Sequence, residues 1–109
     1  MNEPSIYIVT LVTGDEVITN VQKHIEPVNG VDTEVCYKLM YPFSISDAGE
    51  GKIELTPWKK YSPEAQFLIG YDHILNMCVP WPTVTKEYEK AVSNFNKILL
   101  DMSKNDELV

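Results

Sequence analysis

The first 25 residues predict a β-hairpin, which points to a fold built on antiparallel strands. Residues 5–13 (SIYIVTLVT) are rich in β-branched and aromatic side chains, which favour extended backbone. Gly14-Asp15 is typical of a tight turn. Residues 17–25 then alternate between two faces, as a half-exposed strand does.

Further strand-like segments follow the hairpin. They lie at residues 34–41, 52–56, 66–69 and 73–79. We expect a loop at residues 27–32, around Asn29-Gly30, because this dipeptide is typical of turns. We also expect Pro42 to break the third strand and residues 58–66 to form a surface loop. Short strands separated by turn residues are typical of a small barrel, here over about residues 5–80.

The last quarter of the chain has the spacing of a helix. Apolar side chains recur every three or four positions from Tyr88 to Met102 and form one stripe. Thr85 is a candidate N-cap, because its hydroxyl oxygen can accept from a free N–H of the first turn. We therefore expect a helix over about residues 85–104 that packs on the barrel; recruitment of a partner by the stripe is the alternative. With room for one core, residues 1–109 are expected to form a single domain.

The charged residues limit the nucleic-acid chemistry open to the chain. Nine lysines stand against 16 acidic residues, for a formal net charge of −7, and arginine is absent. Arginine is preferred for bidentate phosphate contacts, and phosphate neutralisation supplies most non-specific affinity, so a general nucleic-acid binder is disfavoured. Any nucleic acid would have to be held locally. Residues 58–61 (WKKY) mix cations and aromatic rings as a single-strand stacking patch does, although an exposed loop is the simpler interpretation.

Catalysis and metal binding lack supporting motifs. The chain has no glycine-rich phosphate loop, nucleophile elbow or His-Glu-x-x-His. Cys36, Cys78, His24 and His73 lack the close spacing of structural zinc sites, and the cysteines lie in apolar runs, as small buried hydrophobic residues do. We therefore expect a binding protein without metal or cofactor, not an enzyme. Without a long apolar run or a signal-like N-terminus, it is expected to be cytoplasmic and not to span a membrane.

Residues 73–81 carry no formal charge. A central strand needs no charge, whereas a natural edge strand is usually protected by lysine, proline or a bulge. This segment is therefore either central or an edge that pairs with another copy of the chain around a ring.

Two segments resemble the signature motifs of Sm-like proteins, the family of Sm, LSm and bacterial Hfq. Residues 9–21 (VTLVTGDEVITNV) are similar to the first signature, an apolar strand, a glycine turn and a second alternating strand. Residues 71–80 (YDHILNMCVP) are similar to the Hfq-type second signature, Tyr-Lys-His followed by an apolar strand that ends in Val-Pro. Compact, divergent members of the family occur in bacteriophages, an origin that the arginine-free composition suits.

This resemblance implies a mainly β fold, a strongly bent five-stranded Sm-like (SH3-like) barrel with a C-terminal helix. It also implies a homo-oligomeric ring in which the last strand, residues 73–79, pairs with the fourth strand of the next subunit. In the family, two loops line the pore and hold RNA bases. In this chain the corresponding residues are Tyr71, Asp72 and His73, together with Asn29. Single-stranded RNA binding at these four residues is the expected function.

The chain departs from the family pattern at points that bear on RNA binding. Asp72 replaces the family's basic residue between Tyr and His, and the helix lies at the C-terminus rather than the N-terminus. The stretch 42–66 is also longer than an Hfq barrel needs. The alternative function is an oligomeric protein-interaction scaffold that keeps the Sm architecture and has lost RNA binding. Asp72 and the missing arginines distinguish the two functions.

Overall fold

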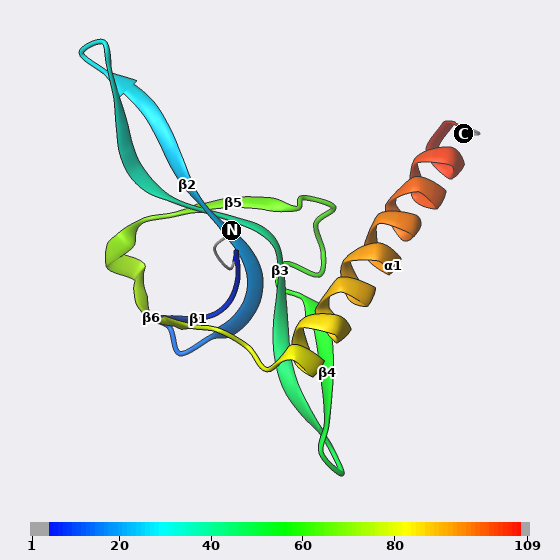
Figure 1. Ribbon diagram of the computed structural model, residues 1–109. Coiled ribbons are helices and arrows are strands. Elements are labelled where there is room, and N and C mark those ends of the chain that lie inside the picture. The colour runs from blue at the N-terminus through cyan, green and yellow to red at the C-terminus, as the bar shows by residue number, and fades with distance from the viewer. Residues whose placement is uncertain (1–4, 108–109) are drawn as a thin grey trace.

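The computed structural model describes residues 5–107 and consists of one curled β-sheet and a long C-terminal helix (Figure 1). The strands are β1 (Ile6–Leu11), β2 (Glu16–Val28), β3 (Val31–Gly49), β4 (Lys52–Pro57), β5 (Gln66–Ile69) and β6 (Ile74–Cys78). A 3-10 turn, η1 (Tyr71–His73), precedes β6, and α1 (Pro82–Glu107) follows it. The predicted mainly β fold with a C-terminal helix is confirmed.

All strand pairs are antiparallel, and the sheet is so strongly curled that it forms half of a barrel. The strand order is β4-β3-β2-β1-β6, and β5 also pairs with β3. β4 pairs with the C-terminal half of β3, with Phe43 opposite Pro57, whereas β5 pairs with the N-terminal half, with Tyr37 opposite Ile69. β4 and β5 are thus two pieces of one strand, separated by the loop 58–65. The expected surface loop in this region is confirmed.

The predicted break of the third strand at Pro42 is wrong, because β3 continues through this residue. Tyr41, just before it, has a φ of 53°, which is unusual for a residue with a side chain. The pairing of β2 with β3 shifts register between Ile18 and Asn20, so β3 has an extra residue there, as in a β-bulge. On its other side Pro42 faces the gap between β4 and β5. The strand therefore bends at a point where proline's missing N–H costs little.

The predicted loop at residues 27–32 is also wrong, because the β2–β3 pairing continues to Val28 opposite Val31. Only Asn29 and Gly30 form the turn, with φ values of 53° and 79°. Positive φ at both central residues is the requirement of a type I′ turn, which Asn-Gly meets well. The two strands therefore extend as a hairpin arm that projects from the curled sheet (Figure 1).

The helix begins at Pro82, three residues before the predicted start. Proline suits the first helical position because its φ is already helical and its missing N–H has no partner there in any case. The carbonyl of Trp81 accepts from the N–H groups of Val84 and Thr85, both at 3.0 Å. The Thr85 hydroxyl donates back to the same carbonyl at 3.4 Å. The prediction that Thr85 is the N-cap is therefore wrong.

The sheet packs a separate core on each of its faces. Five buried side chains fill the inside of the curl: Val9, Leu11, Val17, Val21 and Leu39. On the outer face, Ile18 and Phe43 pack against Tyr88 of α1, with Val92 and Phe95 alongside. Because successive side chains of a strand point to opposite faces, β2 contributes to both cores. The predicted packing of the apolar helical stripe on the barrel is confirmed for the first half of α1.

Candidate functional site

The two ends of the curled sheet carry unpaired strand edges. Within the described chain, β6 pairs with β1 alone and β5 with β3 alone. The sequences of β5 (QFLI) and β6 (ILNMC) contain no charged residue, whereas the outer strand β4 contains Lys52 and Glu54. Natural edge strands usually carry such charges because an unprotected edge pairs with other chains. Residues 73–79 were predicted to be either a central or an edge strand. Because β6 pairs with β1 alone within the described chain, this segment is an edge strand.

Exposed apolar side chains accompany these two edges. On and just after β6, Leu75 is 65% exposed, Val79 63% and Trp81 79%. On β5, Leu68 is 54% exposed. Single exposed apolar residues are ordinary on a protein surface, but a group of them beside unpaired backbone indicates an interaction surface. We call β5, β6 and these four side chains the edge surface.

The turn η1 joins the two edges and holds three of the four predicted RNA-binding residues, Tyr71, Asp72 and His73. The Tyr71 hydroxyl donates to Glu34 Oε2 at 3.0 Å, and its ring meets Tyr37 edge-on with 4.8 Å between centroids. The turn is thus tied to β3 at the base of the hairpin arm.

The carboxylate that Tyr71 contacts also pairs with a lysine. Lys23 Nζ lies 3.1 Å from Glu34 Oε1, and this hydrogen bond, followed by that from Tyr71, lowers the pKa of Glu34. The pKa of Tyr71 is raised by partial loss of solvent and then by the adjacent carboxylate. Glu34 and Lys23 were absent from the predicted site, because only the register of β2 against β3 brings them to Tyr71.

Asp72 and His73 point into solvent. His73 Nε2 lies 3.9 Å from Asp72 Oδ1, and the two side chains are 64% and 85% exposed. Asn29, the fourth predicted residue, lies at the tip of the hairpin arm, which Figure 1 shows standing away from η1. One copy of the chain therefore brings Tyr71, Asp72 and His73 together but leaves Asn29 apart.

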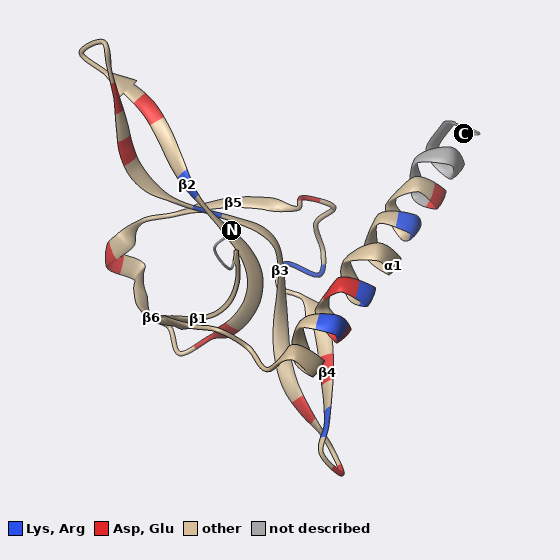
Figure 2. Cartoon of the chain, in the orientation of Figure 1, with Lys and Arg blue, Asp and Glu red and all other residues tan. Residues whose placement is uncertain are grey.

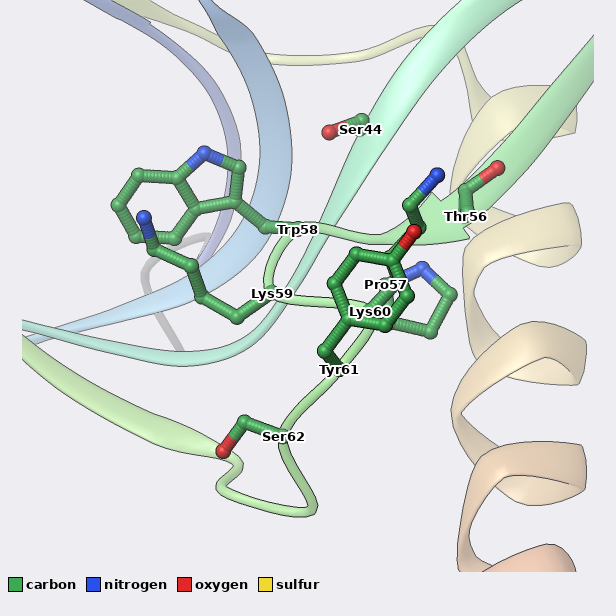
Figure 3. Close-up of a pocket in the computed structure, with 8 residues that line it drawn as sticks. All are labelled: Ser44, Thr56, Pro57, Trp58, Lys59, Lys60, Tyr61 and Ser62. Atoms are coloured by element: carbon green, nitrogen blue, oxygen red, sulfur yellow. The ribbon is translucent and has the colours of Figure 1, made fainter.

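The loop 58–65 forms a second surface, of opposite charge. Figure 2 shows acidic segments on the hairpin arm and at η1, whereas the start of the loop is basic. A hollow of about 550 Å³ lies against this loop and the adjoining parts of β3 and β4 (Figure 3). Its size is in the range of small-molecule sites.

Metal ligation has no support among residues 5–107. No group of three or more His, Cys, Asp and Glu residues in that range is placed to hold a metal ion. Both cysteines are free, Cys36 half-buried and Cys78 exposed, so the expectation that both are buried is wrong. No helix within the described chain is long and apolar enough to cross a membrane.

The fold and the edge surface define a small curled β-sheet protein with two unprotected edges. The chain belongs to a family of unknown function, DUF6561, whose model matches residues 4–93. The matched range includes all six strands and the part of α1 that contacts the sheet up to Val92. A search of curated proteins found no match to this chain.

Proposed function

We propose that this protein is an Sm-like subunit that assembles into a homo-oligomeric ring and binds single-stranded RNA at its η1 turns. The observation that supports assembly is the pair of uncharged, unpaired edges on β5 and β6. If β6 of one copy pairs with β5 of the next, the sheet continues from subunit to subunit and the edge surface becomes covered. A head-to-tail contact of this kind closes into a ring when a whole number of the rotations that relate one subunit to the next makes a full turn.

The sheet order supports the Sm-like assignment. Three antiparallel strands follow one another, the last strand pairs back onto β1, and β4 with β5 forms a fourth strand beside β3. Counted in this way the sheet has the five strands that the resemblance implies, with the loop 58–65 inserted into the fourth. The excess length of the stretch 42–66 then lies largely in that loop.

The position of η1 supports the RNA proposal. The turn lies between the two edges, so assembly would repeat Tyr71 and His73 once per subunit around the ring. The exposed imidazole and the partly exposed phenol present rings on which bases can stack, and repetition would add avidity.

A second candidate, the protein-interaction scaffold, is favoured by the acidic surroundings of this turn. The Tyr71 hydroxyl is engaged by Glu34, and Asp72 is exposed beside it. Both carboxylates repel RNA phosphate, whereas a basic partner protein would find them attractive.

Light scattering at micromolar concentration tests the assembly. We expect a mass several times the 12.4 kDa of one chain. Val79→Glu should reduce it to that of the monomer, because it places a charge on the edge surface. Val31→Glu is the matched control, since Val31 is 65% exposed but lies at the tip of the hairpin arm. A wild-type monomer would contradict the proposal.

Fluorescence anisotropy with oligo-U and oligo-A at low salt tests the ligand. RNA binding that Tyr71→Ala abolishes while the ring persists supports the RNA proposal. If the wild type binds neither oligonucleotide and Asp72→Lys gains binding, the scaffold is correct.

A further inference from the structure

The loop 58–65 is held at both ends by backbone hydrogen bonds, so its backbone has a defined path. The Trp58 N–H donates to the Pro42 carbonyl at 3.0 Å, and the Tyr41 N–H donates to the Ala65 carbonyl at 2.6 Å. Within the loop, the Ser62 N–H donates to the Lys59 carbonyl at 3.0 Å and closes a turn. A surface loop fixed in this way loses little conformational entropy when it binds a ligand.

The turn of this loop carries two pairs of one aromatic ring and one lysine. Lys59 Nζ lies 4.3 Å from the centre of the Trp58 ring, and Lys60 Nζ lies 5.2 Å from the centre of the Tyr61 ring. Figure 3 shows Lys59 alongside the indole and Lys60 beside the phenol. Both ammonium groups thus lie next to aromatic rings, so a cation is close to each surface on which a base could stack.

The two rings differ in solvent exposure. Trp58 is half-buried, packs against the inner core and meets Phe67 edge-on, with 5.5 Å between centroids. Tyr61 is 93% exposed and packs on no core side chain. A large aromatic ring held almost wholly in water gains more from a stacking partner than a buried one does.

The loop 58–65 is locally basic, although the protein as a whole is acidic. Lys59 and Lys60 are the only adjacent lysines in the sequence, and the loop 58–65 contains one carboxylate, Glu64, in a chain of net charge −7. In the described chain, neither lysine forms an ion pair. Two adjacent lysines without ion pairs attract a polyanion to this loop although the molecule as a whole repels it.

From these observations we infer that the hollow beside residues 58–62 is a nucleotide-binding site. The base stacks on Tyr61 and its phosphate is held by Lys60, whose ammonium group lies beside that ring. Lys59, on the Trp58 side of the loop, attracts the next phosphate of a strand, and Ser44 and Thr56 line the same hollow. This site is separate from the proposed RNA contacts at η1. It does not depend on ring assembly, because every lining residue belongs to one copy of the chain.

The two tryptophans make the site directly measurable. In a Trp81→Phe background, Trp58 is the single tryptophan, and ligand at the hollow should change its fluorescence. We would titrate this protein with uridine monophosphate and with oligo-U at low salt. A response to both shows that a free nucleotide suffices, and a response to oligo-U alone assigns the site to nucleic-acid strands. Either result supports the site, and no response to either ligand overturns it.

Charge-matched variants then locate the contact. Lys59→Gln with Lys60→Gln should weaken oligo-U binding at least tenfold and lower the salt slope by about 1.4, the value for two contacts to a single strand. Lys86→Gln with Lys97→Gln makes the same change of charge on exposed positions of α1 and should leave binding unchanged. Tyr61→Ala, at an exposed position that leaves the fold intact, should also weaken binding.

The remaining outcomes separate this inference from the proposed function. If Tyr71→Ala abolishes oligo-U binding and the double lysine variant binds normally, the η1 proposal stands and the loop site is wrong. Mononucleotide binding that persists in Val79→Glu protein supports the loop site even if no ring forms. A polyglutamate peptide that competes as well as oligo-U would show a general anion patch and overturn the nucleotide assignment.

Discussion

The hydroxyl of Tyr88 fastens α1 to the bend of β3, and its removal should measurably destabilise the protein. Tyr88 is buried, and its Oη lies 2.8 Å from the Tyr41 carbonyl and 3.0 Å from the Met40 carbonyl, to which it donates. The same oxygen accepts from the Asn20 N–H at 3.2 Å. The Tyr88 hydroxyl thus satisfies the carbonyl of Tyr41, the residue with a φ of 53°, and the N–H of Asn20, which lies opposite the bulge of β3.

The size of the effect follows from which groups lose a partner in Tyr88→Phe. The Met40 carbonyl keeps the Thr19 hydroxyl, which donates to it at 2.8 Å. The Tyr41 carbonyl and the Asn20 N–H lose the phenol oxygen. A net hydrogen bond contributes about 1 kcal/mol, and a stranded buried polar group costs about 1–3 kcal/mol. Because the ring remains and leaves almost no cavity, we expect the free energy of unfolding to fall by about 2–3 kcal/mol.

Urea unfolding followed by circular dichroism measures this loss. With an m-value of about 2 kcal/mol/M, the midpoint should fall by about 1–1.5 M while the slope stays unchanged. Protein concentration must be equal in all samples, because assembly would add to apparent stability. Tyr61→Phe is the control, since this phenol is 93% exposed and its hydroxyl contacts no buried group. A Tyr88→Phe midpoint within about 0.2 M of the wild type would refute the proposed role of the hydroxyl.

Three further outcomes are expected. Burial raises the pKa of Tyr88 far above its ordinary value of 10, so the folded state keeps a proton that the unfolded state loses. Stability should hold up to about pH 10 and fall above it, and the fall should be smaller in Tyr88→Phe. Gly30→Ala should cost about 1 kcal/mol in thermal unfolding, because Gly30 has a φ of 79° and no atom lies near an added Cβ, so only backbone strain acts. Thr85→Ala should change stability by less than about 0.5 kcal/mol, because the helix begins at Pro82; a loss of about 1 kcal/mol or more would restore Thr85 as the cap.

The local features of this fold could be predicted from the sequence because each depends on residues close together in the chain. Alternation between faces marks the strands, and the apolar stripe marks the first half of α1. Gly14 and Asn29-Gly30 predict turns because these residue types readily adopt a positive φ. The structure shows positive φ at all three residues. The absence of charge in residues 73–79 predicted either a central strand or a self-pairing edge, and the position of β6 at the end of the sheet shows that it is an edge strand.

Other features depend on contacts between distant residues, which no local pattern records. Pro42 looked like the end of a strand, but a bulge against β2 and a gap beyond β4 allow β3 to pass through it. The Tyr71–Glu34 hydrogen bond joins residues 37 positions apart, and the Tyr88 contacts to Met40 and Tyr41 span 48 and 47 positions.

The same reason explains why the candidate sites needed the tertiary structure. In the sequence, residues 58–61 were a short mixture of lysines and aromatic rings, for which an exposed loop was the simpler interpretation. Only the pairing of β4 and β5 with one strand anchors this loop and forms the hollow beside it. The chain's composition predicted that any nucleic acid would have to be held locally, and the tertiary structure decided where two lysines that form no ion pair within the described chain lie beside aromatic rings.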